Sequence, residues 1–183
     1  MSEFWEDVAR KSKQSDTKPM NWSRHFSPKS GTILELGAHK GANLLQWAIQ
    51  GFACHGNDIS QTCKDIFEEN KRKLKLENCN FSVEPAEEFE CDTQFDYVVL
   101  SSMLESVESP LRVLQAAAKA LKPNGEIYIA CLQKWWVPPI RTQKRIVDVK
   151  TLELCCKEAK LRLGKHFTAG KQGQFLIAWA YHE

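Results

Sequence analysis

The chain has 183 residues, of which 43% are hydrophobic and 26% are charged, and its formal net charge is +2. This length is enough to bury a hydrophobic core in one domain without disulfides or structural metals. The small net charge does not indicate binding to nucleic acid or membranes, and no apolar run approaches the roughly 18 residues that cross a bilayer.

The first residues and the cysteines indicate the compartment. Residues 1–7 lack the basic start and the long apolar stretch of a signal peptide. The seven cysteines are scattered without a C-x-x-C pair, so we expect reduced thiols and neither a disulfide framework nor a zinc site. We therefore expect a cytoplasmic protein.

Hydrophobic periodicity predicts helices and strands that alternate along most of the chain. The predicted helices cover residues 2–12, 42–50, 61–74, 111–121 and a segment from 148 or 151 to about 160. The predicted strands cover residues 32–36, 52–57, 80–83, 95–100, 126–131, 162–167 and 174–181. This alternation predicts a doubly wound α/β fold, with a mostly parallel seven-stranded sheet and an antiparallel C-terminal hairpin. Residues 1–30 are predicted to form an N-terminal helix and cap segment, and residues 31–183 the main domain.

The turn after the first predicted strand carries the strongest functional signal. The strand ends in a turn from Gly37 to Gly41 that opens a helix, and the second strand leads to Asp58. Glycines let the backbone approach a ligand, and an acid about 20 residues further on accepts hydrogen bonds from a ribose diol. The pattern predicts a nucleoside site. The alternative interpretation of Asp58 is a cap for the helix that begins near Ser60.

Four segments, taken together, resemble the class I S-adenosylmethionine-dependent methyltransferases. They are E-L-G-A-H-K-G at 35–41, N-D-I-S at 57–60, F-D-Y-V-V to L-E-S-V at 95–107, and L-K-P-N-G-E-I at 121–127. Their order and spacing agree with the family over nearly the whole chain. The resemblance implies a Rossmann-like fold, S-adenosylmethionine as the cofactor, and direct displacement of its methyl group by a small-molecule acceptor.

The resemblance also implies which residues form the cofactor site. These residues are Glu35, Gly37, Ala38, His39, Gly41, Asp58, Ile59, Ala86, Glu87 and Ser101. Glu35 is interpreted either as an acid that holds an ammonium group through water or as a loop acid that accepts backbone N–H groups. Glu105 either faces the cofactor cleft or is a solvated helix residue.

Three residues depart from the family pattern. His39 stands at the middle glycine of the first motif, Pro85 at the acid after the third strand, and Ser106 at a common histidine. They motivate an alternative from another class, a degenerate relative that acts as a binding or scaffold subunit. A nicotinamide-dependent oxidoreductase ranks last, because its fingerprint also requires glycine at His39. The catechol-type relatives bind magnesium through acids where residues 101–103 read Ser-Ser-Met, so no metal is predicted.

The segment after the fifth predicted strand is the candidate acceptor site. Trp135, Trp136 and Arg141 could hold an aromatic or anionic acceptor, or the segment could be a hydrophobic cap over the sheet. Oxygen acceptors and protonated amines need a base, for which His39 and His166 are the candidates. No catalytic residue is assigned, and the oligomeric state is left open.

Overall fold

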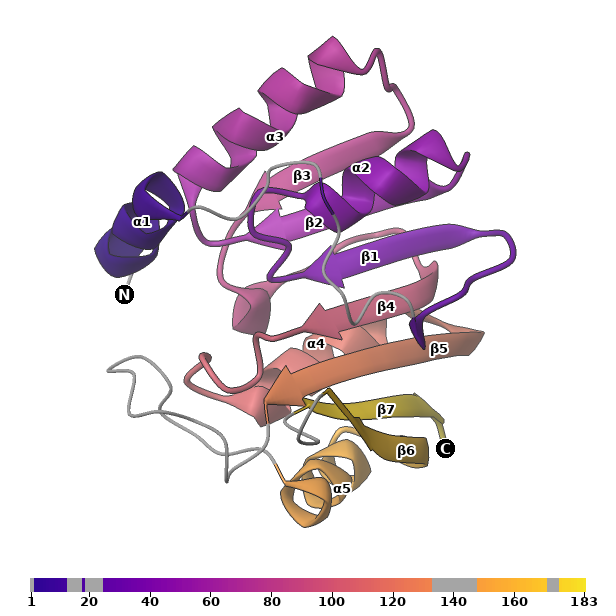
Figure 1. Cartoon of the computed structure of the whole chain (residues 1–183). Helices are drawn as coiled ribbons and strands as arrows, with labels where there is room; N and C mark the ends of the chain where they lie inside the picture. Colours follow the sequence, from indigo (N-terminus) through magenta and orange to yellow (C-terminus); the bar gives the residue numbers. More distant parts are fainter. Residues whose placement is uncertain (1, 13–17, 19–24, 133–147, 171–174) are drawn as a thin grey trace. The chain divides into compact units, whose positions relative to one another are not determined.

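The computed structural model describes residues 2–12, 18, 25–132, 148–170 and 175–183 (Figure 1). The chain divides into two compact units, Met1–Ala86 and Glu87–Glu183. Within the described ranges, no helix is both long enough and apolar enough to span a membrane.

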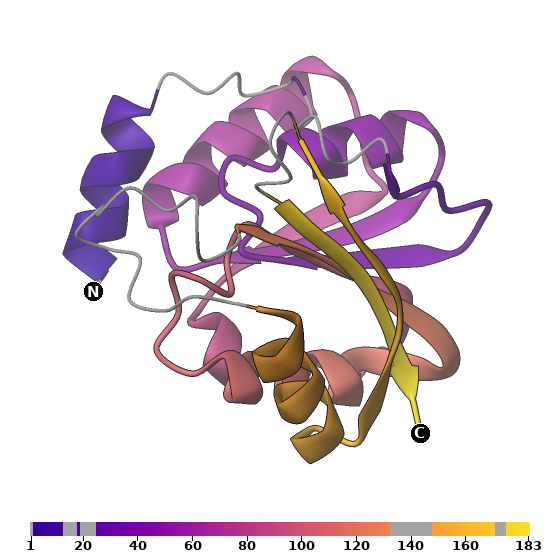
Figure 2. The same ribbon diagram turned by 60° about the horizontal axis from the view of Figure 1, so that its bottom comes forward.

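The first unit contains three parallel strands and three helices. In chain order these are α1 (Ser2–Lys11), β1 (Thr32–Leu36), α2 (Ala42–Ile49), β2 (Ala53–Asp58), α3 (Gln61–Lys73) and β3 (Cys79–Val83). The strands lie in the order β3-β2-β1, and α2 and α3 cover the same face of them in both views (Figures 1 and 2). The apolar residues of β1 have no exposed surface, which explains its continuous hydrophobic sequence.

The second unit begins in a short 3-10 helix at Ala86–Glu88 and is mixed rather than parallel. Its other elements are β4 (Phe95–Ser101), α4 (Pro110–Ala120), β5 (Leu121–Leu132), α5 (Val149–Glu158), β6 (Leu161–Ala169) and β7 (Phe175–His182). β4 pairs in parallel with β5, while β7 is antiparallel to both β5 and β6. The Tyr128 ring is fully buried and meets the Trp179 ring at 5.3 Å between centroids.

These elements confirm the predicted fold class, a mostly parallel α/β arrangement of seven strands with an antiparallel C-terminal hairpin. α5 begins after Asp148, whose carboxylate accepts a hydrogen bond from the Thr151 N–H at 2.7 Å, so the earlier of the two predicted starts holds. The prediction for the fifth strand was too short. β5 begins at Leu121, directly after α4, because Leu121 is already extended and pairs with Phe95. The Pro and Gly that predict a loop lie inside the strand, next to an irregularity in the β4–β5 register.

Candidate cofactor site

The turn after β1 has the predicted strand–turn–helix form. Gly41 is the N-cap of α2 and has a φ of 71°, a left-handed conformation that side chains rarely adopt. A Cβ atom at this position would overlap the Phe67 ring, so the turn packs directly on α3. The Ala38 N–H donates to the Asn57 carbonyl at 2.8 Å, which joins the turn to the end of β2.

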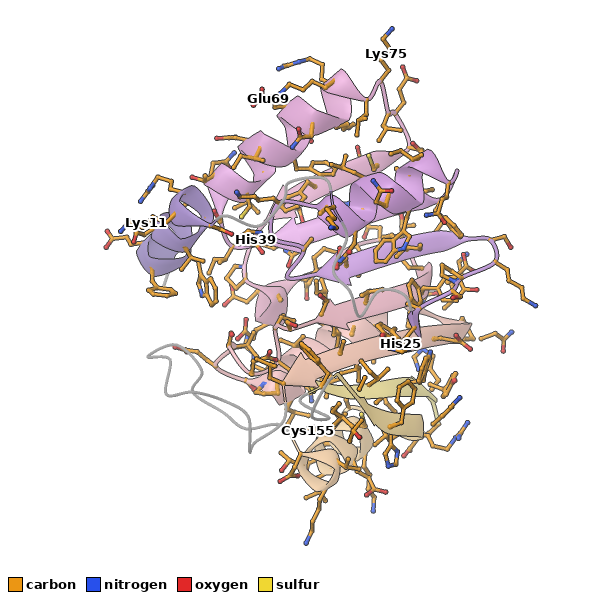
Figure 3. All side chains as sticks on the ribbon, viewed as in Figure 1. Lys11, His25, His39, Glu69, Lys75 and Cys155 are labelled. Carbon is orange, nitrogen blue, oxygen red and sulfur yellow. The ribbon has the colours of Figure 1, made fainter. Side chains whose placement is uncertain are left out.

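Asp58 lies at the end of β2 and joins the two segments that the sequence singled out. Its Oδ2 accepts the His39 N–H at 2.9 Å, and its Oδ1 accepts the Ser60 N–H at 3.1 Å. Figure 3 shows His39 at this end of the strands. A carboxylate can accept about four hydrogen bonds, so Asp58 keeps acceptor capacity for a ligand donor such as a ribose hydroxyl.

The electrostatic setting of Asp58 favours a ligand that donates hydrogen bonds. Burial raises the pKa of Asp58, while the backbone N–H groups of His39 and Ser60 oppose that shift. The alternative interpretation of Asp58 as the helix cap is wrong, because the N-cap of α3 is Ser60. The Ser60 Oγ accepts the Cys63 N–H at 3.2 Å.

Glu35 lies on β1 next to this turn, with only 1% of its surface exposed. Its Oε1 accepts a hydrogen bond from Asn43 Nδ2 at 2.7 Å, whereas Oε2 has no hydrogen-bond partner among the described residues. Burial raises the pKa of Glu35 to about 8, against the effect of the Asn43 hydrogen bond. The described partner is thus a side-chain amide, not the backbone N–H groups that one interpretation expected.

Asn57 adds a second buried acceptor to the same strand ends. It is fully buried, and its Nδ2 donates to the Glu84 carbonyl at 3.0 Å. Its Oδ1 has no partner in the described part of the chain. Buried acceptors without donors are rare in folded proteins. Glu35 and Asn57 thus each keep one buried oxygen without a donor among the described residues.

The other predicted site residues fall into separate groups. Gly37, Ala38 and Ile59 lie on the two segments just described, and Ala86 is buried in the 3-10 helix. Glu87 and Ser101 belong to the second unit, where Glu87 Oε1 accepts the Glu108 N–H at 3.0 Å. Residues Trp135, Trp136 and Arg141 lie outside the described residues.

The two histidines considered as bases have different surroundings. The His39 N–H is bound to Asp58, and its φ of 50° places this non-glycine residue in the left-handed region. His166 is exposed on β6, with Nδ1 at 3.3 Å from the Gly164 carbonyl. The structure assigns neither of them to a reacting atom.

Glu105 follows β4 and is buried, with 1% of its surface exposed. The interpretation as a solvated helix residue is therefore wrong. Burial raises the pKa of Glu105 to about 7, although the backbone N–H groups of Glu105 and Leu132 favour its charged form. Its Oε2 has no hydrogen-bond partner among the described residues.

Asn43, Asn57 and Glu6 belong to this region, but no sequence pattern predicted a role for them. Asn43 follows Glu35 by eight residues, a spacing that is typical of no single element. In the sequence, Asn57 is distinguished only by its position next to Asp58, in the N-D-I-S segment at 57–60. Glu6 reaches α3 across 55 residues of sequence, a contact that no local pattern indicates.

Comparison with known families identifies the domain. A family model described as "Methyltransferase domain" matches residues 10–166. A ubiquinone biosynthesis O-methyltransferase from Coxiella burnetii is 27% identical over 109 residues. That match covers 58% of this chain and 45% of the enzyme, so the aligned region spans slightly less than half of the curated relative.

Solved methyltransferase structures share the fold at low sequence identity. The complex of the Trm112 methyltransferase activator with a methyltransferase from Haloferax volcanii includes a chain that matches with a TM-score of 0.83 and 14% identity, covering 97% of this chain and 96% of that one. The CcbJ methyltransferase from Streptomyces caelestis matches with a TM-score of 0.77 and 14% identity, covering 97% and 95%. The glycopeptide N-methyltransferase MtfA, in complex with S-adenosylmethionine, has a TM-score of 0.73 at 12% identity, covering 88% and 91%.

Proposed function

We propose that this chain, which belongs to the methyltransferase domain family, transfers a methyl group from S-adenosylmethionine to a small-molecule acceptor by direct displacement. The predicted family and class of enzyme are confirmed by the family match and by the methyltransferase fold. MtfA, which shares this fold, was crystallised with S-adenosylmethionine and with sinefungin, and this supports the predicted cofactor. The acceptor, the site residues and the absence of a metal step are the proposed part.

The described residues of the first unit fit this cofactor. Asp58 would receive the ribose hydroxyls, and the turn from Gly37 to Gly41 would lie against the nucleoside. Glu35 and Asn57 each keep one buried oxygen without a donor, which suits the ammonium and hydroxyl groups of the cofactor. The observation that carries the proposal is the hydrogen bond between Asp58 and the backbone of the glycine turn, because it brings together the two segments that the sequence predicts to hold the nucleoside.

The main task of the protein in this reaction is to align the acceptor atom with the methyl group and the sulfonium sulfur. The sulfonium of S-adenosylmethionine supplies a methyl group that is already activated for displacement. The chain has to hold the acceptor in line with that carbon and exclude water, and such positioning contributes roughly 7–11 kcal/mol to lowering a barrier. A small-molecule acceptor is supported by the curated relative, an O-methyltransferase of ubiquinone biosynthesis. Trp135, Trp136 and Arg141 stay the predicted acceptor contacts.

The experiment is cofactor binding measured by isothermal titration calorimetry with S-adenosylmethionine and S-adenosylhomocysteine. Asp58→Ala is expected to weaken both by about 1.5–3 kcal/mol, roughly 10- to 150-fold, because a hydrogen bond to a charged acceptor is lost. Asp65→Ala removes an exposed acid from α3 and serves as the control.

Two outcomes would contradict the proposal. Unchanged affinity in Asp58→Ala would remove this residue from the site. No detectable binding of either compound to the wild-type chain would favour the scaffold alternative. The cytoplasmic location and the division of the chain at residue 30 stay predictions.

A further inference from the structure

The N-terminal helix α1 is attached to the amino end of α3 by a single carboxylate. Glu6 Oε1 accepts the Gln61 N–H at 2.6 Å, and Oε2 accepts the Thr62 N–H at 3.2 Å. Hydrogen bonding from the Thr62 hydroxyl, with further bonds from the backbone and Ser60, holds the pKa of Glu6 below its usual value. The first amides of a helix have no partner within the helix and carry partial positive charge, so a carboxylate there is stabilising.

A second contact holds the opposite end of α1. Lys40, in the glycine turn, is buried to 7% exposure, and its Nζ donates to the Ser12 carbonyl at 3.3 Å. The Ser12 N–H donates to the Val8 carbonyl and so continues the hydrogen bonding of α1. The Ser12 carbonyl that Lys40 contacts therefore lies at the carboxyl end of α1, where a cation is favourable. Between the two contacts, Ala9 is buried with 1% exposure. Figures 1 and 3 show α1 beside the start of α3, near His39.

These contacts end on the two segments that form the candidate cofactor site. Gln61 follows Ser60, which is bound to Asp58, and Lys40 follows His39, which is also bound to Asp58. With the Cys63 N–H bound to Ser60, the amides of residues 60–63 are all occupied by Asp58, Glu6 or Ser60. The backbone that presents Asp58 is therefore held by α1 as well as by its own turn.

We propose that Glu6 is a positioning residue for the methyl donor: it holds α1 on α3 and thereby fixes the Asp58–Ser60 segment that would receive the ribose. This inference rests on the proposed function. α1 is then part of the cofactor site through a contact that does not touch the cofactor.

The charge of Glu6 also acts on Asp58, in the direction opposite to the proposed effect on cofactor affinity. Burial raises the pKa of Asp58, and the neighbouring charge of Glu6 adds to that rise. Removing the charge would by itself favour ionised Asp58 and a stronger ribose contact. Weaker cofactor binding after Glu6→Gln would run against this effect on Asp58, and we expect it to come from the weakened contact with α3 and the loosened Asp58–Ser60 segment.

The test compares Glu6→Gln with Asp7→Asn by hydrogen exchange and by calorimetry. Asp7 lies on the same helix and pairs with Lys11 at 2.7 Å, so its replacement removes an acid of α1 without touching α3. In the ligand-free protein, Glu6→Gln should speed exchange at the Gln61 and Thr62 amides and along α1. It should also weaken binding of S-adenosylhomocysteine about three- to tenfold, in the range of a lost helix cap. Asp7→Asn should do neither.

Each result distinguishes a role of Glu6 in positioning the cofactor site from a purely structural role in holding α1. Faster exchange with unchanged or tighter binding would make the contact purely structural and overturn the proposal, as would equal effects in the two variants. If the wild-type chain binds no S-adenosylhomocysteine, the proposed function fails, and the positioning role falls with it. The exchange data would still show separately whether Glu6 holds α1 on α3.

Discussion

The carboxyl ends of β1 and β4 each have a nearby buried glutamate, Glu35 or Glu105, and a non-glycine residue of positive φ, but the two glutamates have different hydrogen-bond partners. His39 and Ser102 have φ values of 50° and 49°. The Glu35 carboxyl group accepts a hydrogen bond from the side chain of Asn43. The Glu105 carboxyl group instead interacts with the backbone N–H groups of Glu105 and Leu132. Each carboxyl group keeps one oxygen without a partner in the described residues.

The difference shows where the first unit has built a polar site. Around Glu35, hydrogen bonds connect β1, the glycine turn and the end of β2 through Asn43, Ala38 and Asp58. Burial is the largest cause of the raised pKa at both glutamates, but around Glu105 the opposing hydrogen bonds come from the backbone N–H groups of Glu105 and Leu132. A hydrogen-bond network that joins several elements restrains its side chains, while a buried carboxyl group costs stability when it ionises.

The largest effect on the free energy of unfolding is expected from Gly41→Ala, which changes the glycine turn directly. The methyl group would meet the Phe67 ring and would also adopt a φ of 71°. Overpacking costs about 1–3 kcal/mol and a left-handed alanine about 1–2 kcal/mol, so the free energy of unfolding should fall by roughly 2–5 kcal/mol. Gly51→Ala is the matched control, because its φ is 93° with nothing within 4 Å. Equal losses in urea denaturation of the two variants would show that Phe67 does not constrain the turn.

The next effect should come from Asn43→Ala, which leaves Glu35 without its side-chain donor and so makes it resemble Glu105. We expect a loss of about 1–3 kcal/mol in the free energy of unfolding, as for other buried groups left unsatisfied. Because the Asn43 bond lowers the pKa of Glu35, its removal should raise that pKa above about 8 and make the loss greater at high pH. A double-mutant cycle with Glu35→Ala measures the pair, and additive losses would contradict the coupling.

An effect of opposite sign, with a defined pH dependence, is expected from Glu105→Gln. The pKa of Glu105 is raised from 4.5 to about 7 in the folded state, so folding takes up a proton between these values and wild-type stability falls as the pH rises through this window. Glutamine abolishes this loss. The variant should match the wild type near pH 4 and gain about 1–3 kcal/mol above pH 7, as judged by thermal and urea unfolding.

Exposed Glu153→Gln on α5 provides the reference for Glu105→Gln, since it removes the same charge at the surface. A gain of equal size in both variants would mean that net charge, not burial at Glu105, controls the pH dependence.

Local sequence patterns predicted the parts of the site that depend on neighbouring residues. The strand–turn–helix at residues 32–50 and the acid at Asp58 follow from hydrophobic periodicity and glycine placement, and the structure brings them within 2.9 Å at the His39 N–H. Parallel strands end at one edge of a sheet, so residues at successive strand ends meet without further information. The pattern misplaced the start of β5, because Pro123 and Gly125 predict a loop where pairing with β4 extends the strand.

The sequence by itself thus determined the fold class, the family and the position of the glycine turn, because each depends on short-range periodicity and motif spacing. Only the tertiary structure decided that Glu6 holds α1 on α3, that Asn43 binds Glu35 and that Glu105 is buried. The physical reason is that the partners and the burial of a side chain are set by how whole elements pack. Residues 55 positions apart, such as Glu6 and Gln61, become neighbours only once the helices have packed together.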